Sequence, residues 1–298
     1  MNLAIFGTSQ ITSKHINVIR GNNIKIIGIT SLRKNSSNLK SFSSKYKIKG
    51  FKNWTKLIDF SKKFKNCNFL ITGRIKDNFK VLKKLKNFNS FKCVEKPLFL
   101  ENKYFLEFKK DKKIFIGYNR IFYDNIIYLK KKLISRKKIN VIVKIPEENR
   151  NYILTNSCHV ISILFFLFGD LKIVYKFKSK HFTNIILKGK NSIKINISFN
   201  IRNSDNFSIE IFDKEIRYHL KPLEKLKIYI GMERKIYKGL NSYFPKLRYE
   251  TNEKNLNKFK PGFDRQFKEF IKFSRGKKII NDIKFAHKIF KICKIVSK

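Results

Sequence analysis

The sequence is short of arginine and of acidic side chains, and these shortages limit what its large positive charge can mean. Its 298 residues hold 68 Lys and Arg against 21 Asp and Glu, a formal net charge of +47, but only 12 of the 68 are Arg. Arg is the residue that best recognises phosphate and guanine edges. Lys is instead spread from end to end, and Asn, Ile and Phe are abundant with it, as adenine- and thymine-rich codons would produce. We therefore attribute the charge to compositional bias and expect no nucleic-acid partner.

Cysteine is scarce, and its spacing argues against a metal centre. The four residues show no CxxC pair, so neither a zinc site nor a disulfide framework is indicated. We expect no bound metal and four buried thiols in a reducing compartment, at Cys67, Cys93, Cys158 and Cys293.

Long apolar runs are missing as well. The longest, residues 160–168, is interrupted only by Ser162 and is well short of a bilayer span. The first seven residues are too short and too soon polar for a signal peptide, and they read better as a first strand. We expect a cytoplasmic protein without a membrane partner.

What the sequence does contain is enough apolar material for two domains. Hydrophobic residues make up 42% of the chain and include 30 Phe, which argues against wholesale disorder despite the charge. A chain of 298 residues exceeds the usual size of one compact core. We therefore expect two folded domains.

The first third alternates between strand and helix patterns. Residues 3–6 form an apolar strand, a turn leads into a helix through about residue 20, and residues 24–29 form a second strand, which together make a βαβ unit. Further helices are expected at 39–47, 54–61 and 78–85, with strands at 68–71 and up to 94. Strands that alternate with helices predict a parallel, doubly wound sheet.

The second half has a different pattern. Alternating or apolar strand patterns recur at short intervals, several joined by short turns, at 139–145, 173–179, 183–187, 192–200 and 207–212. Hairpin-linked strands predict an open, mostly antiparallel sheet. The segment 231–261 is polar, aromatic-rich and without clear periodicity, so an active-site lid and an oligomer arm are both open for it.

The first strand-to-helix turn is the place where a doubly wound sheet normally holds a phosphate. Of the GxGxxG pattern only Gly7 is kept, with Ser9 and Thr12 at the other glycine positions. Ser is small enough to admit a pyrophosphate at the helix N-terminus, whereas we expect Thr12 to loosen the packing of the helix. The turn by itself is compatible with dinucleotide binding and with a plain connection. The candidate cofactor residues here are Gly7, Thr8, Ser9, Gln10 and Ile11.

The residues after the second strand bear on the choice of dinucleotide. A carboxylate there bonds the ribose hydroxyls of NAD, whereas cations and hydroxyls accommodate the extra phosphate of NADP. The sequence reads Thr-Ser-Leu-Arg-Lys over residues 30–34, with no acid, so Ser31 and Arg33 are candidates. NADP is slightly favoured over NAD.

Several motifs occur in one order along the chain. A Gly7 turn is followed by Thr72-Gly73, by Glu95-Lys96-Pro97, by Gly117-Tyr118-Asn119-Arg120, and by His159 before an apolar stretch that ends at Gly169. This order resembles the glucose–fructose oxidoreductase and inositol dehydrogenase family, called Gfo/Idh/MocA. The resemblance extends over nearly the whole chain, including a late helix at 263–270.

The resemblance implies a fold of α/β plus α+β type. An N-terminal Rossmann domain, residues 1–118, would hold NAD(P) in a doubly wound parallel sheet. A C-terminal domain, residues 119–298, would bind substrate and carry an open, mostly antiparallel sheet. Through that sheet the chain would form a homodimer or homotetramer.

The resemblance also implies roles for particular side chains. Lys96 would lie at the nicotinamide and meet the substrate hydroxyl, and His159 would act as acid or base. Hydride transfer from a carbinol requires both, because the hydroxyl proton must leave while the developing oxyanion is stabilised. Cofactor contacts would further include Thr72, Gly73 and Glu95, and the substrate pocket Asn119, Arg120 and Thr155.

Two departures from the family pattern leave the activity open. Many members have Asp four residues before the histidine and Asp three after it, and this sequence has Thr155 and Ser162 there. Thr cannot hold the negative charge that assists proton transfer. The leading interpretation is an NAD(P)-dependent oxidoreductase of carbohydrate metabolism acting on a sugar, sugar acid or nucleotide sugar. The alternative is a catalytically impaired, nucleotide-binding relative with a regulatory or interaction role.

Overall fold

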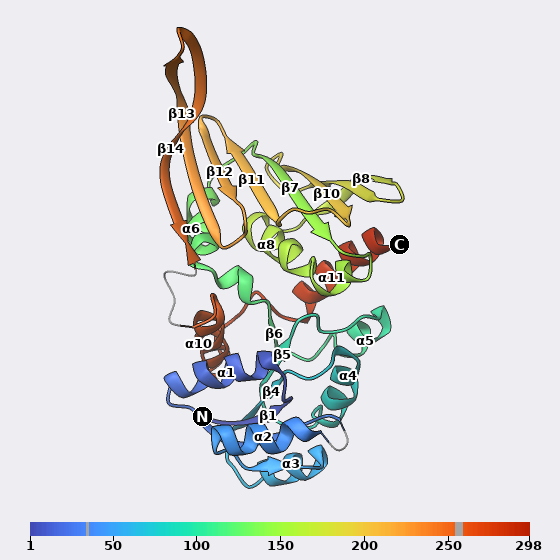
Figure 1. The fold of residues 1–298 in the computed structure, drawn as a ribbon. Coiled ribbons are helices and arrows are strands. Elements are labelled where there is room, and N and C mark those ends of the chain that lie inside the picture. Colours follow the sequence, from blue (N-terminus) through green and yellow to red (C-terminus); the bar gives the residue numbers. More distant parts are fainter. Residues whose placement is uncertain (34–35, 254–258) are drawn as a thin grey trace. The chain divides into compact units, whose positions relative to one another are not determined.

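The computed structural model describes residues 1–33, 36–253 and 259–298, and the chain divides into two compact units (Figure 1). Unit 1 comprises Met1–Asn119 and Gly262–Phe290, and unit 2 comprises Arg120–Pro261 and Lys291–Lys298. The expected division into 1–118 and 119–298 therefore needs a correction, because Gly262–Phe290 returns to the first unit. No helix among the described residues is both long enough and apolar enough to cross a membrane.

Unit 1 is built on a six-stranded sheet of order β3-β2-β1-β4-β5-β6, in which every neighbouring pair is parallel. This is the Rossmann strand order, so the predicted doubly wound sheet is confirmed. The strands are β1 (Asn2–Phe6), β2 (Lys25–Thr30), β3 (Gly50–Phe51), β4 (Cys67–Ile71), β5 (Lys92–Glu95) and β6 (Ile114–Gly117). The helices between them are α1 (Gln10–Gly21), α2 (Ser37–Tyr46), α3 (Trp54–Ser61), α4 (Ile75–Lys84) and α5 (Asn102–Glu107).

The central strands are apolar because helices cover both faces of the sheet. All five residues of β4 are buried, and the rings of Phe6 and Phe69 meet edge to face 5.9 Å apart. Helix α1 is amphipathic and directs a stripe of buried residues toward the sheet, which are Thr12, His15, Ile16, Val18 and Ile19.

Two late helices explain the corrected division. Helix α10 (Phe263–Ser274) packs on the parallel sheet, where its Phe270 ring lies 5.6 Å from that of Phe115 on β6. Asn281 precedes α11 (Ile283–Ser297) and binds the edge strand β6 through both backbone groups of Ile116. This return could not be predicted from the sequence, because the apolar face of an amphipathic helix does not indicate which of two sheets the helix covers.

Unit 2 is built on an eight-stranded sheet of order β14-β13-β12-β11-β7-β10-β9-β8. Its neighbours are antiparallel except for β7 and β10, so the predicted mostly antiparallel sheet is confirmed. The strands are β7 (Asn140–Glu147), β8 (Lys172–Lys178), β9 (Phe182–Lys188), β10 (Lys194–Ile201), β11 (Ser208–Asp213), β12 (Ile216–Leu220), β13 (Lys225–Tyr237) and β14 (Leu240–Asn252). The helical elements are η1 (Asn119–Phe122), α6 (Asp124–Leu133), α7 (Tyr152–Thr155) and α8 (Cys158–Phe168).

One face of this sheet is buried and the other is open. Along β10, Ile195, Ile197 and Phe199 are buried while the residues between them are more exposed, as the two-residue period of a half-covered strand requires. Helices α6 and α8 lie on the buried side (Figure 1). The open face carries Ile142 of β7, which is 38% exposed.

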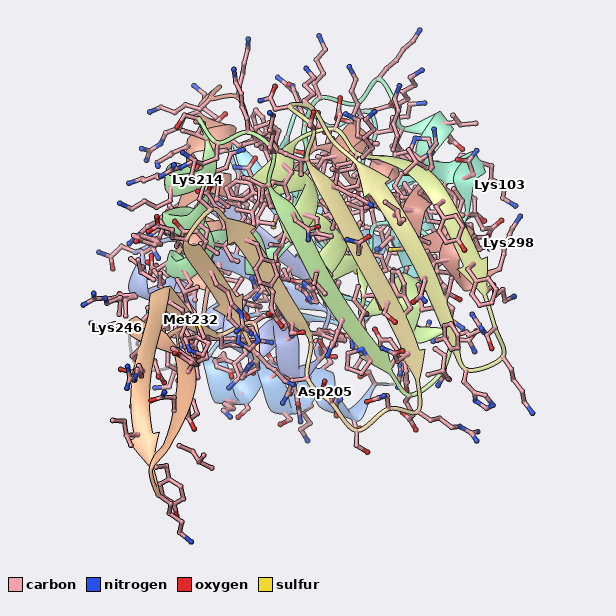
Figure 2. All side chains as sticks on the ribbon, turned by 90° about the horizontal axis from the view of Figure 1, so that it is seen from above. Lys103, Asp205, Lys214, Met232, Lys246 and Lys298 are labelled. Carbon is pink, nitrogen blue, oxygen red and sulfur yellow. The ribbon has the colours of Figure 1, made fainter. Side chains whose placement is uncertain are left out.

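The segment for which the sequence shows no clear periodicity is largely a long β-hairpin. Strands β13 and β14 each run for 13 residues, and from residue 231 onward both of their faces are mostly exposed. Figure 2 shows this hairpin, marked by Met232 and Lys246, extending past the neighbouring strands. An alternating pattern needs one covered face, so a hairpin exposed on both sides lacks it. Residues 254–258 of the segment lie outside the described part of the chain.

Candidate cofactor and substrate sites

The strand order of unit 1 reverses between β1 and β4, and Gly7 lies there in close contact with Thr72. The Gly7 N–H donates to the Thr30 carbonyl and the Thr72 N–H donates to the Phe6 carbonyl, each at 2.8 Å. With φ near +140°, a Cβ on Gly7 would stand 2.4 Å from Thr72 Oγ1 and 2.8 Å from its carbonyl carbon. Glycine is therefore required by the approach of β4. In parallel sheets ligands bind at this kind of reversal, outside the carboxyl ends of the strands.

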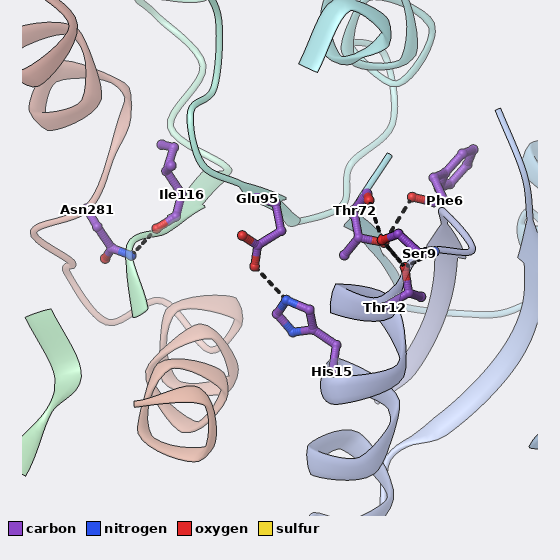
Figure 3. A network of polar contacts seen from close by, with 8 residues as sticks. All are labelled: Phe6, Ser9, Thr12, His15, Thr72, Glu95, Ile116 and Asn281. Carbon is purple, nitrogen blue, oxygen red and sulfur yellow. Dashed lines mark hydrogen bonds and ion pairs between the residues drawn. The ribbon is translucent and has the colours of Figure 1, made fainter. Parts of the chain in front are cut away.

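Thr12 occupies the third glycine position of the turn without loosening it (Figure 3). Its side chain is fully buried, and its Oγ1 lies 2.8 Å from Thr72 Oγ1. The same oxygen accepts the Ser9 N–H at 3.1 Å, which caps the start of α1. The expected loosening is therefore wrong, because the hydroxyl is hydrogen-bonded on both sides. Ser9 and Gln10 are exposed at the first turn of α1, where an α-helix offers N–H groups to an anion.

A cavity lined by positively charged side chains begins three residues after the end of β2. Ser31 is buried and its Oγ accepts the Arg33 N–H at 3.2 Å, while Arg33 itself is exposed. A cavity of about 690 Å³ begins at Arg33 and runs along α2 and β3. Among the described residues that line it there is no acid, and its polar side chains are those of Arg33, Lys40, Lys52, Ser36, Ser43 and Ser44. Lys34 lies outside the described residues.

Glu95 of the Glu-Lys-Pro segment is paired with a histidine of α1 (Figure 3). His15 Nε2 lies 2.6 Å from Glu95 Oε1, and His15 is only 1% exposed. Lys96 is half-buried, and the Lys96–Pro97 peptide is cis. The sequence alone assigned no role to His15. A signal was present, however, because His15 follows Thr12 by three residues and so lies on the apolar face of α1.

A second polar side chain reaches the same edge from the late helix α10. A Cβ on Gly117 would lie 3.1 Å from Glu95 Oε1 and 3.3 Å from Gln266 Nε2. Gln266 is 1% exposed, so Glu95 and Gln266 converge over the end of β6. Sequence reasoning missed Gln266, although it lies within the late helix that carried the resemblance. Asn119, two residues beyond Gly117, is buried.

In unit 2, His159 is the second residue of α8 and is 7% exposed. Its carbonyl accepts the Ser162 hydroxyl at 2.7 Å, so the residue at the second Asp position of the family pattern is bonded to the helix backbone. Thr155 ends α7, and its carbonyl accepts the Cys158 thiol at 3.4 Å. The guanidinium of Arg120 lies 5.7 Å from the centre of the Phe207 ring.

A carboxylate that sequence reasoning missed lies at the start of α8. Glu147 ends β7, is 5% exposed, and accepts a hydrogen bond from Asn156 Nδ2 at 3.1 Å and another from the Ser157 hydroxyl. A negative charge is favoured at a helix N-terminus. Thr155 stands where the family pattern expects an Asp. Unit 2 nevertheless has a buried acid, Glu147, which is bonded to the segment that leads to His159.

The structure groups the predicted residues within each unit. Gly7, Thr72, Gly73 and Lys96 directly follow the carboxyl ends of β1, β4 and β5 in unit 1, and Glu95 is the last residue of β5. Thr155 and His159 belong to unit 2. The joint action of Lys96 and His159 stays a prediction.

Comparison with known proteins supports the fold. No family model matches the sequence, and no curated protein matches it. Among solved structures, the dehydrogenase MviM of Clostridium difficile is similar at 19% identity and a TM-score of 0.75, covering 99% of this chain and 98% of that one.

Two further structures extend this comparison. UDP-N-acetylglucosamine 3-dehydrogenase GnnA of Acidithiobacillus ferrooxidans is similar at 12% identity and a TM-score of 0.73, with 99% and 96% of the two chains covered. A Gfo/Idh/MocA family oxidoreductase of Vibrio cholerae reaches 11% and 0.73, with 99% and 98% covered. At these identities the likeness shows the fold. The chain therefore has the fold of the Gfo/Idh/MocA-type dehydrogenases, as the order of its motifs predicted.

Proposed function

We propose that this protein is an NADP(H)-dependent dehydrogenase acting on a hydroxyl or carbonyl of a sugar, sugar acid or nucleotide sugar. The observation that carries the proposal is the way α1 is bonded to the sheet. Thr12 binds Thr72 after β4, and one helical turn later His15 binds Glu95 at the end of β5. These two contacts hold the N-terminal end of α1, where phosphates would bind, and the strand end that precedes Lys96 at the same edge of the sheet. GnnA, which has the same fold, is a nucleotide-sugar dehydrogenase.

The chemistry assigns separate tasks to Lys96 and His159. A bound nicotinamide would supply or accept the hydride of the carbinol carbon. The Lys96 ammonium stabilises negative charge on the substrate oxygen, and the His159 imidazole takes or returns its proton. Imidazole suits this task because its ordinary pKa lies near neutral pH. Glu147 supplies negative charge at the start of the helix that carries His159.

The preference for NADP rests on the cavity after β2. An extra phosphate on the ribose requires cations or hydroxyls, and the lining offers Arg33, Lys40 and Lys52 together with three serines. NAD recognition would instead use a carboxylate, and the described lining has none. Of the residues that line the cavity, Arg33 is the nearest in sequence to the end of β2, and its side chain is exposed.

A binding titration tests the cofactor. We expect the fluorescence of NADPH to change on binding and NADPH to bind at least tenfold more tightly than NADH. Arg33→Ala should weaken NADPH about tenfold, the effect of losing roughly one charge-assisted hydrogen bond, and leave NADH unchanged. Arg275→Ala, an exposed arginine of the same unit outside the cavity, is the matched control. If neither nucleotide binds, the cofactor proposal is wrong.

Turnover tests the enzyme. The assay follows absorbance at 340 nm with NADP⁺ and two substrates. UDP-N-acetylglucosamine is the substrate named for GnnA, and myo-inositol is the substrate of the inositol dehydrogenases that the motif order resembles. For the active substrate, Lys96→Ala and His159→Ala should each lower kcat by about 10² to 10⁴, the usual contribution of a positioned acid or base. Lys56→Ala and His181→Ala, exposed residues of units 1 and 2, are the controls. Unchanged rates in the first pair would remove both assignments.

A second candidate is a nucleotide-binding relative without turnover. It is favoured by one observation, namely that Thr155 and Ser162 stand where the family pattern has Asp and that Ser162 is bonded to the backbone of α8. Tight NADPH binding with no turnover on a broad sugar panel would support it.

We also propose that the chain forms a homodimer or homotetramer through the open face of the unit 2 sheet. Ile142 lies on that face between Asn196 and Glu210 of the neighbouring strands. Ile142→Lys should therefore shift the species measured by light scattering toward the monomer. Ile134→Lys is the matched control, because Ile134 is 73% exposed at the end of α6. A monomeric wild-type protein would refute the proposal.

A further inference from the structure

Unit 1 contains a second cavity, at the opposite edge of the sheet from the cofactor residues. It measures about 790 Å³ and is lined by residues 86–89, Lys92 and the segment 106–113. Lys92 begins β5, and Lys113 directly precedes β6. Gly117 and the Glu95-Lys96 pair end the same two strands. Four residues of a strand span roughly 13 Å, so the two sites are separated by the depth of the sheet.

The lining is strongly cationic, even for this chain. Six of the thirteen lining residues are lysine, against 56 of 298 in the whole sequence. They are Lys86, Lys92, Lys109, Lys110, Lys112 and Lys113. The acids in the lining are Asp111 and the exposed Glu107. The cavity therefore carries an excess of positive charge, which attracts an anion.

One of these lysines is built into the floor. Lys92 is 1% exposed, and its Nζ lies 3.5 Å from Asp111 Oδ2. Burial lowers the pKa of Lys92, and the neighbouring Asp111 partly offsets that effect. The other Asp111 oxygen accepts the Lys113 N–H at 2.8 Å. Asp111 pairs with the Lys92 ammonium and accepts the Lys113 N–H, so Glu107 is the other acid among the described lining residues that can balance the exposed lysines of the rim.

The walls of the cavity are held in place by backbone hydrogen bonds. The Lys92 N–H donates to the Lys113 carbonyl at 2.8 Å, and the Asp111 N–H donates to the Phe108 carbonyl at 2.9 Å. Lys113 Nζ also donates a hydrogen bond to the side-chain oxygen of Asn89, and both residues line the cavity. Phe88, Leu106 and Phe108 supply apolar surface between the cations. A site with fixed walls binds a ligand with less loss of conformational entropy than a mobile one.

We propose that this cavity binds a diphosphate-bearing anion, with the phosphate groups on the lysine rim. Phosphate is the common anion that offers several oxygens and more than one charge to a group of ammonium ions. The ligand is an inorganic diphosphate or a nucleoside diphosphate whose base uses the apolar surface of the cavity. The site is independent of the proposed dehydrogenase activity and of its cofactor edge.

Calorimetric titration of the full-length protein with inorganic pyrophosphate tests the proposal. The variant Lys110→Ala/Lys112→Ala removes two exposed rim lysines, and Lys14→Ala/Lys56→Ala removes two exposed lysines of unit 1 outside the cavity. We expect the first variant to bind pyrophosphate about tenfold more weakly, a few-fold for each lost ion pair, and the control to change by less than twofold. Equal losses in both variants would show unspecific attraction to a basic protein and overturn the proposal, as would no binding to the wild type.

Two further measurements identify the ligand and the role of the floor. Lys92→Met should abolish pyrophosphate binding, because it leaves the Asp111 carboxylate facing the anion, while circular dichroism verifies that the variant is folded. Unchanged binding by folded Lys92→Met would contradict the proposal. ADP is titrated into wild type and Lys110→Ala/Lys112→Ala, and only the binding lost in the variant is assigned to the cavity. If the ADP binding that is lost in the variant is tighter than pyrophosphate binding, the ligand is a nucleoside diphosphate. If it is weaker, the ligand is the inorganic anion.

Discussion

Replacement of Gly7 by alanine tests the close packing of the first turn against β4. A Cβ at Gly7 would lie 2.4 Å from Thr72 Oγ1, 2.8 Å from the Thr72 carbonyl carbon and 2.9 Å from its oxygen. The hydroxyl could rotate away, but only by leaving Thr12, and the other two atoms belong to the backbone of the strand end. The clash must therefore be relieved by displacing β4 or the turn.

The expected cost has two parts that a control separates. A side chain at positive φ costs about 1 to 2 kcal/mol, and overpacking in a buried site costs roughly 1 to 3 kcal/mol more. Together these parts predict that Gly7→Ala lowers the free energy of unfolding by about 2 to 5 kcal/mol. Gly276 also has positive φ, near +90°, but no atom lies within 4 Å of its Cβ position. Gly276→Ala should therefore cost only the first part.

The single tryptophan makes the assay specific to unit 1. Trp54 is the only Trp of the chain, and its ring lies 6.5 Å from that of Phe6 on β1. Urea unfolding followed by Trp54 fluorescence thus reports on the sheet that contains the turn. If Gly7→Ala proves no more destabilising than Gly276→Ala, the steric argument for Gly7 fails, and its role would have to come from ligand approach alone.

Three further predictions concern Glu147, His219 and Cys67. Glu147→Ala should lower the unfolding free energy by about 2 kcal/mol, because the buried Ser157 hydroxyl and the half-buried Asn156 amide lose their acceptor. An equal loss in His181→Ala, measured by circular dichroism, would argue against this. Burial lowers the pKa of His219, so the unfolded chain binds more protons between that lowered pKa and the ordinary value. The melting temperature should then fall as pH drops through this window, and His219→Gln should flatten that slope. Burial raises the pKa of Cys67 to about 12, so Ellman's reagent at pH 8 should not label Cys67 until the protein is unfolded.

Much of the fold could be predicted because its signals are local. The apolar residues of β1, β2 and β4, separated by helix-length segments, identify a parallel sheet before any contact is known. The return of α10 to unit 1 could not be predicted in the same way. Its Phe side chains fit any apolar sheet face, and only tertiary packing against β6 selects the one it covers.

The candidate site, too, could be predicted only in part from the sequence. The order of Gly7, Glu95-Lys96-Pro97 and His159 indicated a dehydrogenase fold from sequence alone. The sequence did not indicate that Thr12 would fit at the third glycine position of the turn and stabilise it. The reason is that the Thr12 hydroxyl finds its partner in Thr72, sixty residues away.

The sequence by itself therefore determined the strand and helix pattern, the two sheet types and the positions of the motifs, because each depends on neighbours within a few residues. The tertiary structure decided which side chains work together. It brought His15 to Glu95 across eighty residues and placed Glu147 at the start of the helix that holds His159. Such pairings depend on chain segments that meet only after folding, and residue types or spacing do not encode them locally.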